Sequence, residues 1–212
     1  MSKSTTRKRT AAEIPAAYAK PNSSIPPPDK NNPSKFKPTE ESELSTQLLG
    51  PSDGVTKLFT DSIKDIYWAE NHLVKALPAV VNASSSKSLK NAITEHLEQT
   101  KTHARRLEEI FQALGLKKEA KKCDAMEGLT KEAEGVIEMT DKGSPARDLG
   151  IIMASQKVEH YEISAYTGLI KLADRLNLSE VSALLTQTLD EEVKADNTLA
   201  AVADNEITWD EQ

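Results

Sequence analysis

The chain has 212 residues, enough for one well-buried domain with an appendage, and its formal net charge of −6 argues against a nucleic-acid binder over the whole length. Aromatic residues make up only 4% of the chain and there are eight glycines, a composition that favours an all-α protein over a β-sandwich. The single cysteine, Cys123, excludes an intramolecular disulfide and suits a reducing, cytoplasmic compartment. No stretch approaches the ~20 apolar residues of a membrane span, and the basic N-terminus lacks the apolar run of a secretory signal, so we expect no membrane partner.

Residues 1–53 contain eight of the ten prolines and few long apolar side chains. Such a segment buries too little surface to offset its chain entropy, so we predict a disordered N-terminal tail. Its beginning is basic, with Lys3, Arg7, Lys8 and Arg9. A solvated linker is the simplest interpretation. An arm that contacts DNA or a partner protein, or an organellar targeting segment, are the alternatives.

After the tail, apolar residues recur at helical spacing. The first helix is predicted over residues 55–81, and Pro78 is expected to kink or end it. The second follows a serine-rich turn at residues 84–86 and ends at Leu114, where Gly115 can adopt the left-handed conformation that closes a helix.

Three further helices complete the predicted domain, which spans residues 54–204. A shorter helix is expected at 119–140. A long one over 144–176 opens with a serine cap followed by a proline at the first helical position. The last long helix runs over 179–203, and residues 205–212 are predicted to be frayed.

The four long helices carry ionisable side chains on their apolar faces, where leucines would be expected. These inward residues are Glu70, His96, His103, Glu159, Glu162 and Glu192. An ionised carboxylate costs several kcal/mol to bury unless something compensates its charge, and a pair of metal ions would do so. Carboxylates with one or two imidazoles suit iron, manganese or zinc. A metal-free polar network and hydrogen-bonded core histidines are the alternative interpretations.

The tetrapeptide Glu-His-X-Glu occurs twice, at residues 95–98 and 159–162, but the helical phase separates the two copies. In the first copy the histidine points inward and the glutamates face water, whereas in the second the glutamates point inward. Glu98 and His160 are therefore second choices as metal ligands.

Two more residues are candidates for a supporting role. Asp196 lies at the edge of the apolar face of the last helix, as an additional ligand or a group behind one. Tyr166 is one turn beyond Glu162 and is placed to donate a hydrogen bond to a ligating carboxylate. The ligand from the second helix stays open among four residues: His96, Glu98, Gln99 and His103.

Several motifs are similar to those of the YciF/YciE stress-protein family, a branch of the ferritin-like superfamily. They lie at residues 66–70, 96–100, 123–129, 156–163 and 188–192, the last followed by Asp196. The resemblance covers about residues 55–203. It implies a ferritin-like four-helix bundle, with the short extra helix in the crossover between the second and third long helices. It also implies a homodimer, a di-iron or di-manganese centre and a link to stress responses.

The chain departs from the usual ferritin-like pattern, in which two helices each carry a Glu-X-X-His. Here Glu159 is followed by Glu162, and Glu192 is followed by Ala195 where the histidine would lie. Gln99 occupies a position where some relatives have a glutamate, and His103 is the candidate to replace it.

These observations give two function hypotheses. In the first, the chain is a stress-response protein that binds two iron or manganese ions, with zinc as a substitute, and reacts with peroxide or oxygen. Its proposed ligands are Glu70, His103, Glu159, Glu162 and Glu192, with His96 and Asp196 as additional groups. In the second, the bundle is a non-enzymatic interaction module whose basic tail recruits a partner or DNA. An iron-storage cage is disfavoured, because the crossover helix and the tail do not resemble a shell-forming subunit.

Overall fold

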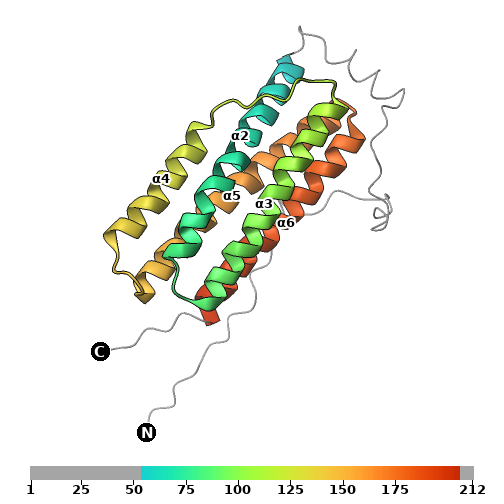
Figure 1. Cartoon of the computed structure of the whole chain (residues 1–212). Helices are drawn as coiled ribbons and strands as arrows, with labels where there is room; N and C mark the ends of the chain where they lie inside the picture. Colours follow the sequence, from blue (N-terminus) through green and yellow to red (C-terminus); the bar gives the residue numbers. More distant parts are fainter. Residues whose placement is uncertain (1–53, 206–212) are drawn as a thin grey trace. The chain divides into compact units, whose positions relative to one another are not determined.

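A computed structural model describes residues 54–205 of the chain (Figure 1). Within this range the chain forms α-helices and no strand: α2 (Gly54–Ala83), α3 (Lys87–Ala113), α4 (Asp124–Met139), α5 (Pro145–Arg175) and α6 (Ser179–Asn205). The predicted all-α class is confirmed. The predicted disordered tail and the alternative function assigned to it lie outside the described residues, as does the predicted frayed end except for Asn205. None of the helices between 54 and 205 combines the length and apolar character needed to cross a membrane.

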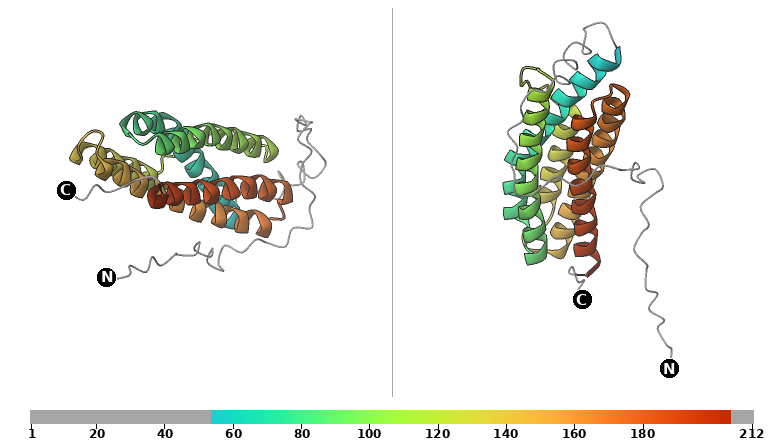
Figure 2. Two further views of the ribbon diagram at one scale, coloured as in Figure 1. Left: turned by 90° about the horizontal axis from the view of Figure 1, so that it is seen from below. Right: turned by 90° about the vertical axis from the view of Figure 1, so that its right-hand side faces the viewer.

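The four long helices α2, α3, α5 and α6 form a bundle, and the crossover helix α4 lies against α2 and α5 (Figures 1 and 2). Helix α3 ends and α4 begins at the same end of the bundle, so α4 carries the chain back along the bundle before α5 starts. As a result, α3 and α5 run in the same direction although they are consecutive long helices. This is the predicted ferritin-like arrangement, with an extra helix in the crossover.

Helix ends follow local chemistry that the sequence partly revealed. The Ser144 hydroxyl accepts the Arg147 amide at 3.1 Å, and Pro145 is the first residue of α5, as predicted. Gly115, just after α3, has φ +64°, the left-handed conformation expected for it. Asn177 ends α5 in the same conformation, with φ +57°, and was not predicted to do so. Asparagine tolerates this region better than most residues, so the structure is consistent with its chemistry.

Pro78 was predicted to kink or end the first helix, but it does not end α2. The helix continues through it to Ala83, two residues beyond the predicted end at Val81. Pro78 is exposed, and the next residues keep the apolar spacing that holds the helix against the core. Its missing amide removes one backbone hydrogen bond, a loss that the packing of Leu77 and Val80 outweighs.

Helix α4 begins at Asp124, five residues later than the predicted start at Glu119. The Lys121 amide donates instead to the Lys64 carbonyl of α2 at 3.1 Å, which holds the preceding segment out of a helix. The Cys123 sulfur then caps α4 by accepting the Met126 amide at 3.4 Å. The first contact depends on the tertiary fold and the second on an unusual cap. Local helix propensity therefore predicted the start of α4 too early.

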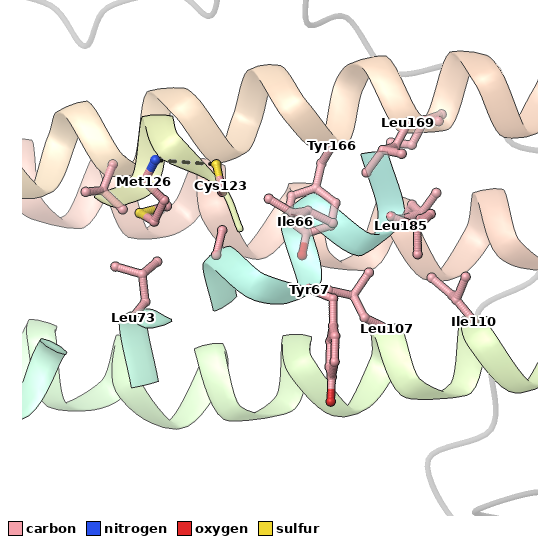
Figure 3. Close-up of a cluster of buried hydrophobic side chains, with 14 of the residues drawn as sticks. Ile66, Tyr67, Leu73, Leu107, Ile110, Cys123, Met126, Tyr166, Leu169 and Leu185 are labelled. Carbon is pink, nitrogen blue, oxygen red and sulfur yellow. Dashed lines mark hydrogen bonds between the residues drawn. The ribbon is translucent and has the colours of Figure 1, made fainter. Parts of the chain in front are cut away.

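Apolar side chains from all five helices form the core, including Ile66, Leu107, Met126, Leu169 and Leu185 (Figure 3). Each fully buried aliphatic side chain contributes about 1.5–3 kcal/mol through burial. The apolar positions of α2 continue on both sides of Glu70, which is itself fully buried. A carboxylate therefore interrupts an otherwise apolar helix face.

Asp148 near the start of α5 fixes the turn between α2 and α3. It is 4% exposed, and its carboxylate accepts the Ser85 amide at 2.8 Å, the Ser86 amide at 2.7 Å and the Ser85 hydroxyl at 2.6 Å. These bonds satisfy donors that lie close to the N-terminal end of α3. The Asp148 side chain thus connects the beginning of α5 to the turn between α2 and α3.

We predict that Asp148→Ala lowers the free energy of unfolding by about 2–3 kcal/mol, because it leaves buried donors without an acceptor. Urea denaturation followed by circular dichroism measures the change. Asp141→Ala, at an exposed position, is the control and leaves the midpoint within error. Equal midpoints for the two variants would show that the turn does not depend on Asp148.

Candidate metal centre

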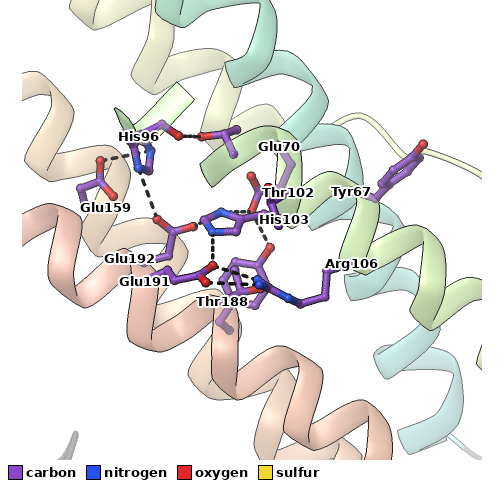
Figure 4. Close-up of polar contacts among 12 residues, drawn as sticks. Tyr67, Glu70, His96, Thr102, His103, Arg106, Glu159, Thr188, Glu191 and Glu192 are labelled. Atoms are coloured by element: carbon purple, nitrogen blue, oxygen red, sulfur yellow. Dashed lines mark hydrogen bonds and ion pairs between the residues drawn. The ribbon is translucent and has the colours of Figure 1, made fainter. Parts of the chain in front are cut away.

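The structure gathers six inward side chains from four helices into one cluster, and all of them except Glu162 are labelled in Figure 4. They are Glu70 of α2, His96 and His103 of α3, Glu159 and Glu162 of α5, and Glu192 of α6. All six are less than a tenth exposed. The cluster consists of two groups. Within each group, the potential ligand atoms all lie within 4.8 Å of one another. One contains His96, Glu159, Glu162 and Glu192, and the other contains Glu70, His103 and Glu192.

Glu192 belongs to both groups, and its two oxygens face different histidines. Oε1 lies 2.8 Å from Nδ1 of His103, and Oε2 lies 3.9 Å from Nδ1 of His96. His96 Nε2 is also 3.5 Å from Oε1 of Glu159, and His103 Nδ1 is 3.6 Å from Oε1 of Glu70. Each group therefore has one imidazole, and the Glu192 carboxylate connects them.

The hydrogen bonding of the cluster is incomplete, and this tests whether metal ions fit it. Among the described residues, eleven buried side-chain nitrogen and oxygen atoms lack a hydrogen-bond partner, and nine of them belong to these six side chains. Both oxygens of Glu162 and of Glu192 are among them, as are both ring nitrogens of His96. His103 Nδ1 is also unpartnered, because its close contact with Glu192 is poorly aligned for a hydrogen bond. Unsatisfied atoms of this kind are costly and rare, whereas bound cations would use them as ligands.

Burial raises the pKa values of all four carboxyl groups, but the net shifts differ in direction. For Glu159 and Glu162, burial and the neighbouring carboxylates raise the pKa well above its usual value. The pKa of Glu70 is also raised, chiefly by burial. For Glu192, burial acts in the same sense, but the close contact with His103 and the charge of its ring outweigh it and lower the pKa. Without metal, the cluster therefore keeps protons on some carboxyl groups.

The two histidines differ in charge. Burial lowers the pKa of His96 and favours its neutral ring. Burial has the same effect on His103, but contacts with Glu191, Glu192 and Glu70 outweigh it and raise its pKa to about 12. In the metal-free protein His103 is thus an imidazolium between carboxylates. Because a ligating nitrogen must be deprotonated, a metal ion bound at His103 would displace a proton.

Glu191 and Arg106 hold the far side of the His103 ring. His103 Nε2 is 2.8 Å from Oε2 of Glu191, and Arg106 grips both oxygens of that carboxylate at 3.0 and 3.3 Å. Arg106 also donates to the Thr188 hydroxyl at 2.6 Å. These contacts, which depress the pKa of Glu191 to about 2, keep a proton on Nε2 and aim Nδ1 at Glu70 and Glu192. Metal-ligating histidines are oriented in this way by a carboxylate behind them.

Tyr166 lies on the other side of the cluster and donates its hydroxyl to Oε1 of Glu70. The phenol is fully buried, and burial together with nearby carboxylates raises its pKa well above the usual value, so it stays protonated as a donor. The predicted donor role is thus matched by the structure. Its acceptor is on α2 rather than on α5, which its own spacing to Glu162 did not reveal.

Asp196 and the second-choice residues lie outside the two groups. Asp196 binds Gln156 at 3.1 Å and His160 at 3.3 Å, beside the cluster rather than within it. His160 and Glu98 are exposed, as their helical phase predicted. Gln99 is turned toward Glu95, at 3.5 Å.

Glu191 and Arg106 were not predicted as site residues from the sequence. Both lie next to the apolar stripes rather than on them, and Glu191 is 36% exposed at its side chain. A prediction from helical periodicity selects residues by the direction in which their side chains point from the helix. Arg106 follows His103 by one turn, and this spacing was the available sign that the two could share a partner.

The sequence and the fold of this chain are similar to those of known proteins. The family described as a domain of unknown function (DUF892) matches residues 54–210. Protein YciF of Escherichia coli (strain K12) is 39% identical over 154 residues, which cover 72% of this chain and 92% of YciF. The crystal structure of the E. coli stress protein YciF matches with a TM-score of 0.69, covering 72% of this chain and 96% of that one. YcfI from Rhodopseudomonas palustris, described as a candidate structural protein, matches with a TM-score of 0.68 at 36% identity over 72% of this chain and 97% of its own.

We predict that the metal-free protein loses stability as the pH rises from about 7 to 9. The folded state keeps a proton on His103, with a pKa of about 12, that the unfolded chain releases above 6.5. Each proton that only the folded state retains lowers the free energy of unfolding by about 1.4 kcal/mol per pH unit in this window. The raised pKa values of Glu159 and Glu162 act in the same direction, and the lowered pKa of His96 acts only below 6.5.

Thermal unfolding at pH 7, 8 and 9 measures this effect in chelator-treated protein. The His103→Gln variant is the control and should show a smaller slope, because it has no imidazolium to retain. A midpoint that rises with pH in the wild-type chain would contradict the assigned charge of His103.

We also predict that Glu191→Gln weakens metal binding by about 10- to 100-fold with little change in fold, because the amide holds the ring less strongly than a carboxylate does. Titration of the metal-free protein with Mn(II) or Fe(II), followed by calorimetry, measures the affinity. Glu98→Gln, exposed on α3, is the matched control and leaves it unchanged. Unchanged affinity in Glu191→Gln would exclude this residue from orienting His103.

Proposed function

This chain belongs to the DUF892 family, and we propose that it is a stress-response protein that binds two iron or manganese ions and reacts with peroxide or oxygen. The link to stress is supported by the E. coli relative, which is 39% identical and described as a stress protein. The metal assignment is supported by the cluster itself.

The concentration of unpartnered atoms carries this proposal. Nine buried donor and acceptor atoms converge from four helices, where ordinary packing would have used apolar side chains or complete hydrogen bonds. Two divalent cations would balance the charge of the four carboxylates, so the loaded centre needs no further counter-ion. His96, Glu159 and Glu162 would hold one ion, Glu70 and His103 the other, with Glu192 shared between them.

The donor set suits iron and manganese, which accept carboxylate oxygens together with imidazole nitrogens. A pair of such ions supplies Lewis acidity and a source of electrons for peroxide or oxygen. The chain's own residues prepare the site. Glu191 and Arg106 hold the proton of His103 on Nε2, and Tyr166 holds Glu70 by a hydrogen bond. Burial of all six side chains excludes bulk water.

Metal content of the full-length protein tests the proposal. After reconstitution with Fe(II) or Mn(II), we expect about two ions per chain by elemental analysis. The variant Glu159→Gln/Glu162→Gln should lose at least one of them. Glutamine resembles the protonated carboxyl groups that the raised pKa values favour, so this variant should keep the stability of the metal-free protein.

Glu98→Gln/Glu180→Gln, at two exposed positions, is the matched control and should bind metal normally. Peroxide consumption should accompany the metal and disappear with it. Full peroxide consumption by chelator-treated protein, or no bound metal after reconstitution, would overturn the proposal.

A further inference from the structure

A cavity of about 190 Å³ lies directly beside the candidate metal centre. All five described helices contribute to its walls, which are mainly aliphatic: Leu73, Leu77, Ile93, Ile137, Val158 and Leu199. His96 and Glu159 of the metal centre also line it. The cavity is thus an apolar space with a polar inner end.

His96 gives this inner end its chemical character. The residue is only 7% exposed, yet neither ring nitrogen has a hydrogen-bond partner. Oε2 of Glu159, which is 2% exposed, is also unpartnered. A molecule in the cavity would therefore find buried, unpartnered polar atoms at this end, whereas the other walls are mainly aliphatic.

Apart from His96 and Glu159 at the inner end, the charged residues that line the cavity are exposed and balanced in sign. They comprise two lysines and two glutamates: Lys75, Lys194, Glu95 and Glu134. Lys194 and Glu95 form an ion pair at 3.7 Å. The cavity thus offers no excess of positive charge to attract an anion, and its mainly aliphatic walls disfavour the burial of a negative group.

Its size limits what it can hold. An apolar cavity of about 150 Å³ stays dry and binds benzene, so one of about 190 Å³ accommodates a ring with a small substituent. Aliphatic walls offer water too few hydrogen-bond partners to compete well with such a ligand.

We propose that this cavity binds a neutral organic molecule with an apolar body about the size of a benzene ring and one terminal hydroxyl or hydroperoxyl group. The apolar body packs against the aliphatic walls, and the O–H end faces His96 and Glu159. This inference rests on the proposed function, whose site it extends from the bare metal pair to an organic substrate.

Benzyl alcohol is an unreactive probe of the right size, and its binding to the metal-free full-length chain is the first test. NMR titration of side-chain methyl groups should show saturable shifts at Leu77, Ile93 and Leu199. Benzoate should bind at least about tenfold more weakly, because its charge would have to leave water for mainly aliphatic walls. No saturable binding of benzyl alcohol, or tighter binding of benzoate, would overturn the proposal.

Cavity-filling variants locate the binding. Ala92 of α3 lines the cavity, whereas Ala165 of α5 does not, and both are partly buried against the core. Ala92→Leu should reduce affinity for benzyl alcohol at least about tenfold, and Ala165→Leu should leave it unchanged. Ala133→Leu fills the cavity from α4 and serves if Ala92→Leu does not fold. Equal affinity in the wild type and in a folded cavity variant would overturn the proposal.

The metal-loaded protein then distinguishes the two end groups. Loss of tert-butyl hydroperoxide consumption in Ala92→Leu, with hydrogen peroxide consumption kept, assigns the hydroperoxide. If both are kept while benzyl alcohol binding is lost, the hydroxyl compound is the ligand. Because the first test uses metal-free protein, its failure leaves the metal count unaffected, and a chain that binds the alcohol but no metal would separate the two proposals.

Discussion

The fold depends on how four carboxylates are accommodated inside a helical bundle. In the metal-free state, protons and one imidazolium carry the compensating charge. Glu159 and Glu162 hold protons more strongly than usual, and His103 stays charged between Glu191 and Glu192. This compensation leaves many polar atoms without partners. The proposed binding of two divalent cations in place of these protons would use the same side chains as ligands.

Helical periodicity alone predicted much of the fold and of the cluster. It identified the long helices, and it separated the inward Glu159 and Glu162 from the outward His160, because the direction of a side chain follows from its position on a regular helix. Features that depend on tertiary contacts were not predictable in this way. The late start of α4 follows from a backbone bond to Lys64, and the contact of Arg106 with Glu191 joins residues of two helices.

Helix α4 has a function that the bundle itself does not require. The four long helices alone provide the six clustered side chains, so the centre would be complete without it. The cavity, however, takes part of its wall from α4, through Thr130, Ala133 and Ile137. The crossover helix thus contributes to the wall of the cavity but not to the cluster of candidate ligands.

Pro78 connects this cavity to the mechanics of α2. Because proline has no amide hydrogen, the Val74 carbonyl one turn earlier lacks the donor that a regular helix would provide. The weakened turn lies between Leu73 and Val80, both of which line the cavity. Helices bend most readily where such a bond is missing. The part of α2 that forms the cavity wall is therefore held by one backbone hydrogen bond fewer than the turn that carries Glu70, which lies one turn before Val74.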